Sequence, residues 1–95
     1  NKVKIMSISY QWIDKSKKVN ASTGLVESLH FCLEVINSEE EINDHAVAVL
    51  SLGSDVSRDA EYWTEQKLTE KAESIRSEYN WDQTLKNGLE AKLKE

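Results

Sequence analysis

The apolar residues near the N-terminus alternate with polar ones. Within the range Val3 to Ile13, every second position from residue 6 is apolar: Met6, Ile8, Tyr10 and Trp12. A period of two is typical of a β-strand with one buried face, so we predict a strand here. The next residues, 14–22, are polar and show no period, which predicts a connector.

Beyond the connector, the apolar positions fit one face of an α-helix. They follow an i, i+4, i+7, i+8, i+11 spacing at Leu25, Leu29, Cys32, Leu33 and Ile36. Val26 and Val35 widen this face, and Ser22 or Thr23 is suited to cap the helix. We therefore predict a buried helix that ends at Asn37.

A capping box follows in the sequence Ser38-Glu39-Glu40-Glu41 and predicts a second helix that starts at Glu39. Large and small residues then each recur every seven positions: Ile42, Val49, Val56 and Trp63, and Ala46, Gly53 and Ala60. Such alternating rows allow a neighbouring helix to approach closely. The neighbour could be the first helix or a helix of another molecule.

A second helix of full length is too long for a compact monomer. From Glu39 to Tyr79 it would span about 60 Å at 1.5 Å per residue, whereas a compact domain of this size has a radius of gyration of about 12 Å. We therefore expect a break near residues 53–55 or 64–67, or else an elongated dimer. The range His45 to Gly53 also fits a buried strand, which would give a β-α-β-α order.

Two further apolar stripes predict helices in the C-terminal part: Leu68, Ala72, Ile75 and Tyr79, and then Trp81, Leu85, Leu89 and Leu93. Asn80 lies between them and is suited to end the first. The expected fold class is therefore α+β and predominantly helical, with one N-terminal strand followed by three or four helices. An all-α bundle is the alternative.

Charge divides the chain into two unlike parts. The 95 residues are predicted to form a single domain, 1–95, and carry a net charge of −5. Residues 1–20 hold five lysines and one aspartate, a balance of +4, which leaves −9 on the other 75 residues. We therefore distinguish a basic N-terminal strand and connector, 1–21, from an acidic helical part, 22–95.

Composition also bears on location. No apolar stretch approaches the roughly 18 residues that a membrane span needs. The lone Cys32 lies among apolar neighbours, which favours a reduced, buried thiol and a cytoplasmic location.

The predicted strand lacks a partner if every other element is a helix. Its backbone groups would then have no ladder, and each buried unpaired group costs about 1–3 kcal/mol. The same strand of a second copy, or the sheet edge of another protein, could supply the ladder. A hairpin or a loosely packed tail is the alternative. We therefore expect a protein partner, a second copy, or both.

Groups that could carry catalysis are few. The chain has two histidines and one cysteine, and no spacing assembles them into a site. Glu27 and His30 form one Glu-x-x-His pair, which on a helix suits a carboxylate-bridged di-metal bundle. We expect no enzyme, no cofactor and no metal, and a di-metal helical bundle enzyme is the second alternative.

Nucleic-acid binding is the first alternative function. Five lysines of residues 1–20 interleave with Tyr10 and Trp12 on a strand that could lie in a groove or stack bases. Against it, only Arg58 and Arg76 could read bases in a bidentate manner, and the acidic remainder repels phosphate.

The function that the sequence favours is a small regulatory domain, an inhibitor or adaptor that binds a larger protein and itself, as small phage-type accessory proteins do. Aromatic residues concentrate binding energy where they are exposed. We expect the partner-binding residues to be Met6, Ile8, Tyr10 and Trp12 on the strand, and Tyr62, Trp63 and Trp81 on a helix surface. Core packing is the alternative role for each of them.

Overall fold

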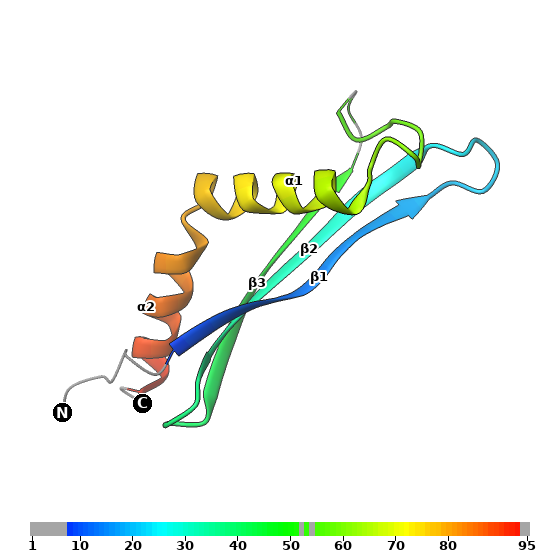
Figure 1. Ribbon diagram of the computed structural model, residues 1–95. Helices are drawn as coiled ribbons and strands as arrows, with labels where there is room; N and C mark the ends of the chain where they lie inside the picture. Colours follow the sequence, from blue (N-terminus) through cyan, green and yellow to red (C-terminus); the bar gives the residue numbers. More distant parts are fainter. Residues whose placement is uncertain (1–7, 52, 54, 94–95) are drawn as a thin grey trace.

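The computed structural model describes residues 8–51, 53 and 55–93, and consists there of three β-strands followed by two α-helices (Figure 1). The strands are β1 (Ile8–Val19), β2 (Val26–Asn37) and β3 (Ile42–Ser51). The helices are α1 (Glu65–Glu78) and α2 (Trp81–Leu93). The first part of the predicted N-terminal strand, including Met6, lies outside the described residues.

The strands form one antiparallel sheet in the order β1-β2-β3, and each is joined to the next as a hairpin. Both helices lie on the same side of the sheet and meet at an elbow (Figure 1). α1 contacts β1, whereas α2 contacts β2 and β3. Because the two helices follow one another along the long strands, the molecule is elongated, with extents of 55 × 19 × 19 Å.

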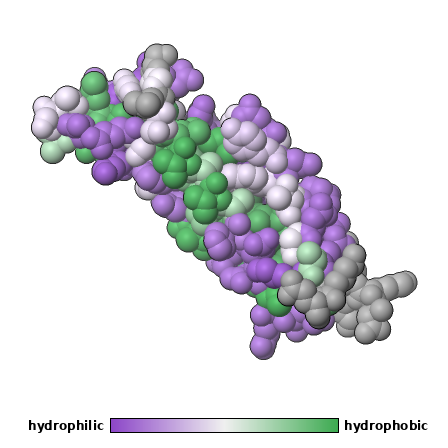
Figure 2. All heavy atoms as spheres, turned by 180° about the vertical axis from the view of Figure 1, so that it is seen from behind, coloured by the Kyte–Doolittle hydropathy of each residue, from purple (hydrophilic) through white to green (hydrophobic). Residues whose placement is uncertain are grey.

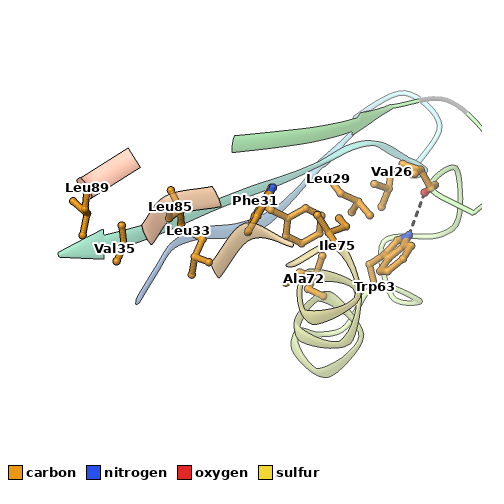
Figure 3. Packing of buried hydrophobic residues seen from close by; sticks show 13 residues of the cluster. Val26, Leu29, Phe31, Leu33, Val35, Trp63, Ala72, Ile75, Leu85 and Leu89 are labelled. Atoms are coloured by element: carbon orange, nitrogen blue, oxygen red, sulfur yellow. Dashed lines mark hydrogen bonds between the residues drawn. The ribbon is translucent and has the colours of Figure 1, made fainter. Parts of the chain in front are cut away.

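The hydrophobic core lies between the sheet and the helices (Figure 3). The central strand β2 turns every second residue towards the helices: Leu29, Phe31, Leu33 and Val35. The helices close the core with Leu68, Ala72 and Ile75 of α1, and with Trp81, Leu85 and Leu89 of α2. The other side of the sheet is not covered by either helix, and we call it the open face.

The predicted fold class is wrong, and so is the all-α alternative. The structure has three strands and two helices, and the part from residue 22 onwards contains β2 and β3 as well as both helices. The connector predicted after Ile13 is also wrong, because β1 continues to Val19. In residues 25–36 a helical spacing and a period of two coexist. The period of two prevails because β2 pairs with a strand on each side and buries one face under the helices.

The helix predicted from Glu39 is wrong as well. Residues 38–41 form the turn between β2 and β3, in which Asn37 Oδ1 accepts hydrogen bonds from the N–H groups of Glu39 and Glu40, each at 3.1 Å. Glu41 has a φ of 54°, in the left-handed region that tight turns use. The alternative strand over His45 to Gly53 is correct for residues 45–51.

The C-terminal predictions are confirmed. Thr64 caps α1, because its Oγ1 accepts the N–H of Lys67 at 3.2 Å, in the region where a break was expected. Asn80, with a φ of 52°, separates the helices. The predicted stripes are buried at the positions given above, whereas Tyr79 is exposed.

The elbow between the helices is fixed by a polar cluster. Arg76 Nε and Nη2 donate to the two carboxylate oxygens of Asp82 at 2.6 and 3.1 Å. The guanidinium lies 5.2 Å from the ring centroid of Tyr10, whose hydroxyl donates to the backbone oxygen of Asp82 at 3.0 Å. The hydrogen bond to Asp82 raises the pKa of Arg76. This bidentate pair holds the start of α2 against both α1 and β1.

Replacing Asn37 by alanine is expected to destabilise the fold by about 1–3 kcal/mol. Asn37 is fully buried, and without its oxygen the N–H groups of Glu39 and Glu40 lose their acceptor. Ser38→Ala, an exposed position in the same turn, is the control and should change stability by less than about 0.5 kcal/mol. Urea unfolding followed by circular dichroism measures both, and equal midpoints for the two variants would contradict this role of Asn37.

Candidate functional site

The N-terminal strand is paired within the chain. The β1–β2 register runs from Ile8 opposite Asn37 to Val19 opposite Val26. The ladder that we expected from a second molecule is therefore supplied by β2, so this strand does not require an outside partner.

The aromatic residues of β1 face the helices. Ile8, Tyr10 and Trp12 pack against the core, and Trp12 Nε1 donates to Glu73 Oε2 at 3.2 Å. The ring centroid of Trp12 lies 6.1 Å from that of the buried Trp81. The structure thus brings Tyr10, Trp12 and Trp81 to the same side of the sheet, as a packing layer between β1 and the helices.

The other two predicted aromatic residues lie before α1. Trp63 is buried, and its Nε1 donates to the backbone oxygen of Val56 at 3.1 Å. Tyr62 packs edge-on against Trp63, and its ring lies 4.4 Å from the Arg58 guanidinium and 4.6 Å from Lys67 Nζ. Among the predicted binding residues that the structure describes, Tyr62 is the most exposed.

The Glu-x-x-His pair lies on β2 and not on a helix. His30 Nε2 lies 2.8 Å from Ser28 Oγ on the open face, and Glu27 lies three positions away from His30. Positions three apart on a strand point to opposite sides, so the two side chains do not converge. Within residues 8–51, 53 and 55–93, no cluster of three or more His, Cys, Asp or Glu side chains could hold a metal ion.

Cys32 lies at the middle of the open face. Burial raises the pKa of its thiol, and the nearby carboxylates of Asp14 and Glu34 raise it further. The thiol is therefore protonated at neutral pH, which does not favour a nucleophilic role.

The open face carries exposed valines along β3. Val47 and Val49 are 61% and 54% exposed, and they lie opposite Cys32 and His30 of β2. Seen from behind, hydrophobic residues gather along the middle of the molecule, with hydrophilic residues around them (Figure 2). Apolar side chains left contiguous on the surface of a small domain often mark an interaction site.

A polar row bounds this apolar area on one side. Glu34 accepts hydrogen bonds from Gln11 Nε2 of β1 and Asn43 Nδ2 of β3, both at 2.8 Å. These two bonds lower the pKa of Glu34, and His45, its partner on β3, lowers it slightly more. These hydrogen bonds connect all three strands and place the Glu34 carboxylate at one end of the row formed by Val47 and Val49.

The outer edge of β3 divides into two parts. The His45 N–H donates to Asp44 Oδ1 at 3.0 Å, and Lys92 Nζ of α2 donates to the backbone oxygen of Asn43. These bonds show that the backbone groups of residues 43 and 45 point away from β2. Since backbone direction alternates along a strand, those of Val47, Val49 and Ser51 point outwards too.

We call these outward groups of Val47, Val49 and Ser51 the free edge. They bond to nothing else in the part of the chain that the structure describes. Residues 43 and 45, in contrast, form a capped part of the same edge, because Lys92 and Asp44 satisfy one group in each.

The other edge of the sheet is protected. β1 carries a register shift between Trp12 and Asp14, and a bulge of this kind interrupts further pairing. Lys17 Nζ donates to the backbone oxygens of Ala60 and Trp63, at 2.6 and 2.8 Å, so the chain before α1 lies beside this strand. β3 has no register shift against β2 and contains no lysine or arginine.

A shallow hollow of about 460 Å³ lies at the end of the free edge, next to α1. Its lining joins the end of β3 to the chain that follows and to one lysine of α1: Val49, Leu50, Ser51, Gly53, Asp55, Val56 and Lys71. The hollow leaves space beside the strand on its helix side.

No family of known proteins, no curated protein and no solved structure matches the chain. None of the helices that the structure describes has the length and apolar character needed to cross a membrane. Function must therefore be inferred from the surface itself.

The free edge was missed by reasoning from the sequence. The signal was present in the uncharged run from Ala46 to Gly53, in which alanine and valine alternate over residues 46–49. Such a run fits a strand without charged side chains, which the sequence offered only as the alternative to a helix.

Proposed function

We infer that the protein is a small interaction domain that binds another polypeptide by adding a strand to the outer edge of β3. The observation that carries this proposal is the free edge of Val47, Val49 and Ser51. It presents unbonded backbone groups and lacks the bulge and lysines that protect β1.

The energy of such binding has two sources. Three outward residues supply about six backbone donors and acceptors, and each hydrogen bond formed contributes about 0.5–1.5 kcal/mol net. The exposed valines add cross-strand contacts on the open face, each worth about 0.2–1 kcal/mol. Association has its own cost, so we expect binding that is reversible and suited to regulation.

This function is in the class that the sequence favoured, a protein-binding domain. The proposed binding surface, however, is the free edge of β3 and not the set of aromatic residues. The aromatic residues Tyr10, Trp12 and Trp81 stabilise the scaffold, while the free edge binds. The proposed role remains that of an inhibitor or adaptor, because addition of a strand at a sheet edge is a binding activity. A cytoplasmic location is part of the proposal, because the chain has a single cysteine and this thiol is free.

Nucleic-acid binding has less support. The hypothesis needs exposed aromatic rings beside the lysines of β1, whereas Tyr10 and Trp12 face the helices. Lys15 Nζ donates to Thr69 Oγ1 at 3.3 Å, and Lys17 binds two backbone oxygens, so these charges are already engaged.

Selection from a displayed library of random linear peptides tests the proposed function. We expect selected peptides to be rich in β-branched and aromatic residues, and to bind the Val49→Pro variant at least tenfold more weakly. The Val49 N–H points away from β2, so proline there removes an outward donor while sparing the sheet's own ladder.

Val49→Ala is the matched control, because it shortens the same side chain but keeps the N–H. It should bind the selected peptides within about threefold of wild type if backbone pairing dominates. Circular dichroism verifies that both variants are folded. Peptides that bind Val49→Pro as tightly as wild type, or a selection that enriches none, would refute strand addition at β3.

A further inference from the structure

We propose that the strand that β3 accepts is β3 of a second copy, in an antiparallel pair whose two-fold axis passes at Val49. The pair joins two three-stranded sheets into one six-stranded sheet. This inference rests on the proposed function, since it names the occupant of the same edge.

The capping of the edge selects the register. A two-fold axis at Val49 places the Val49 residues of the two copies opposite each other. It also places Val47 of each copy opposite Ser51 of the other. Every outward backbone N–H and C=O group of the free edge then faces an unbonded backbone group of the second copy. An axis at Ala48 would instead place Ser51 opposite His45, whose N–H is already bonded to Asp44. The register centred on Val49 is the one that pairs all three residues of the free edge with one another and leaves the capped part unused.

The short length of β3 favours pairing with β3 of a second copy over pairing with a strand of a different protein. β3 ends at Ser51, and Gly53 has a φ of 105°, a conformation that turns the chain out of the strand. In the proposed register Ser51 of the second copy lies opposite Val47. The second copy's chain therefore turns away from the edge before it reaches the capped residue His45. An extended foreign strand would continue past that point and meet Lys92, which covers the edge at Asn43.

The charge at the interface permits self-association. Each copy carries a net charge of −5, which opposes the approach of two copies at long range. On the open face, however, β2 and β3 present no Asp, Glu, Lys or Arg side chain beside the free edge: the side chains there are Ser28, His30, Cys32, Val47, Val49 and Ser51. On this face, two such edges meet without like charges opposite each other.

The apolar contacts are also symmetric. Val47 and Val49 of both copies would form one row of four valines on the open face. The valines of a monomer are more than half exposed, so each gains cover from the partner strand. The interface is small and is expected to be in the weak, reversible class.

Engineered disulfides test the register directly, in a Cys32→Ser background that removes the native thiol. Residues opposite one another in a hydrogen-bonded pair have Cα atoms about 5.5 Å apart, inside the roughly 4.4–6.8 Å range of disulfides. We expect Val49→Cys to give a covalent dimer under mild oxidation. Val47→Cys is the control, because in this register its two copies are offset by four residues, about 13 Å along the strands, and its yield should be at least tenfold lower.

A mixture of the Val47→Cys and Ser51→Cys proteins should give the mixed covalent dimer, since these positions face each other. Equal yields from Val47→Cys and Val49→Cys would overturn the proposed register. Failure of every single-cysteine protein to cross-link would overturn self-pairing. In that case peptides that still bind wild type and not Val49→Pro would leave the proposed function standing.

Mass in solution provides the second measurement. Light scattering of the wild-type chain should show a mass that rises from one copy towards two with increasing concentration. Val49→Pro should remain a single copy throughout. Ile13→Lys, at the exposed bulge of β1 on the other edge, should follow the wild-type curve. A wild-type chain that stays a monomer, or a Val49→Pro variant that dimerises equally, overturns the proposal.

Discussion

Replacing Phe31 by alanine is expected to destabilise the fold by about 3–5 kcal/mol, the range found for a large aromatic removed from a core. Phe31 is 1% exposed and lies at the middle of the central strand, where β2 faces both helices (Figure 3). Its loss leaves a cavity that a sheet paired on both sides cannot close. A small domain has only about 5–15 kcal/mol of stability, so the variant should be largely unfolded at modest urea concentrations.

Cys32→Ala is the matched control for Phe31→Ala. Cys32 is the next residue of β2 and lies on the open face, where its side chain is only half-buried. We expect its replacement to cost less than about 1 kcal/mol. Urea unfolding followed by circular dichroism gives both free energies of unfolding. Similar costs for the two variants would mean that the two faces of β2 do not differ in packing as described.

The part of the fold predicted correctly is the part with a single consistent signal. In residues 64–93, threonine at the cap, asparagine at the stop and apolar residues at i, i+4 spacing all indicate helices. A residue such as Leu85 has no alternative strand partner at a spacing of two. Local and tertiary preferences agree there, so the prediction from sequence holds.

In β2 the local signal was ambiguous. Leu29 and Leu33 belong both to a helical stripe and to a row with a period of two. Val35 also fits both, and Phe31 fits only the row with a period of two. The acidic turn after Asn37 resembles a capping box, although the asparagine itself accepts the N–H bonds of the turn. The sheet forms because β2 has a partner on each side, which a reading of one segment at a time does not reveal.

The candidate site could be predicted less well than the fold, for a physical reason. Tyr10 and Trp12 are the residues that composition favours for binding, but the same apolar surface makes them suited to packing under the helices. The free edge depends on the direction of backbone groups, and direction depends on which neighbour each strand has. No side-chain type encodes that direction at Val47 or Ser51.

The two edges of the sheet differ in how far they are protected against pairing with a further strand. On β1, a bulge and the contacts of Lys17 with the chain before α1 prevent further pairing. On β3, the contacts among the described residues cap the edge only at residues 43 and 45. In the dimer that we propose, a sheet protected on one side and at one end of the other side accepts one short strand at one place, which would limit assembly to a pair and prevent growth into a fibre.

Replacing Trp63 by alanine is the second change with a large expected effect, about 3–5 kcal/mol. Trp63 is 6% exposed and anchors the segment between β3 and α1, because its indole N–H donates to the backbone oxygen of Val56 (Figure 3). Val56 is itself buried and lines the hollow beside the free edge. The same segment bonds to the start of β2, where the N–H of Val26 donates to the oxygen of Arg58 at 2.8 Å.

Trp63→Phe separates the indole hydrogen bond from the volume of the ring. Phenylalanine keeps most of the apolar contact but removes the indole N–H, while the Val56 oxygen still accepts the N–H of Arg58 at 2.7 Å. We therefore expect a smaller loss, of about 0.5–1.5 kcal/mol for the one hydrogen bond. Hydrogen exchange adds a local measurement: in Trp63→Phe the Val26 amide should exchange faster, while that of Phe31 changes in proportion to global stability alone. If both amides change equally, Trp63 contributes only to the core. If Val26 alone responds, the indole holds the segment that supports the end of β3, and the free edge keeps its shape because of it.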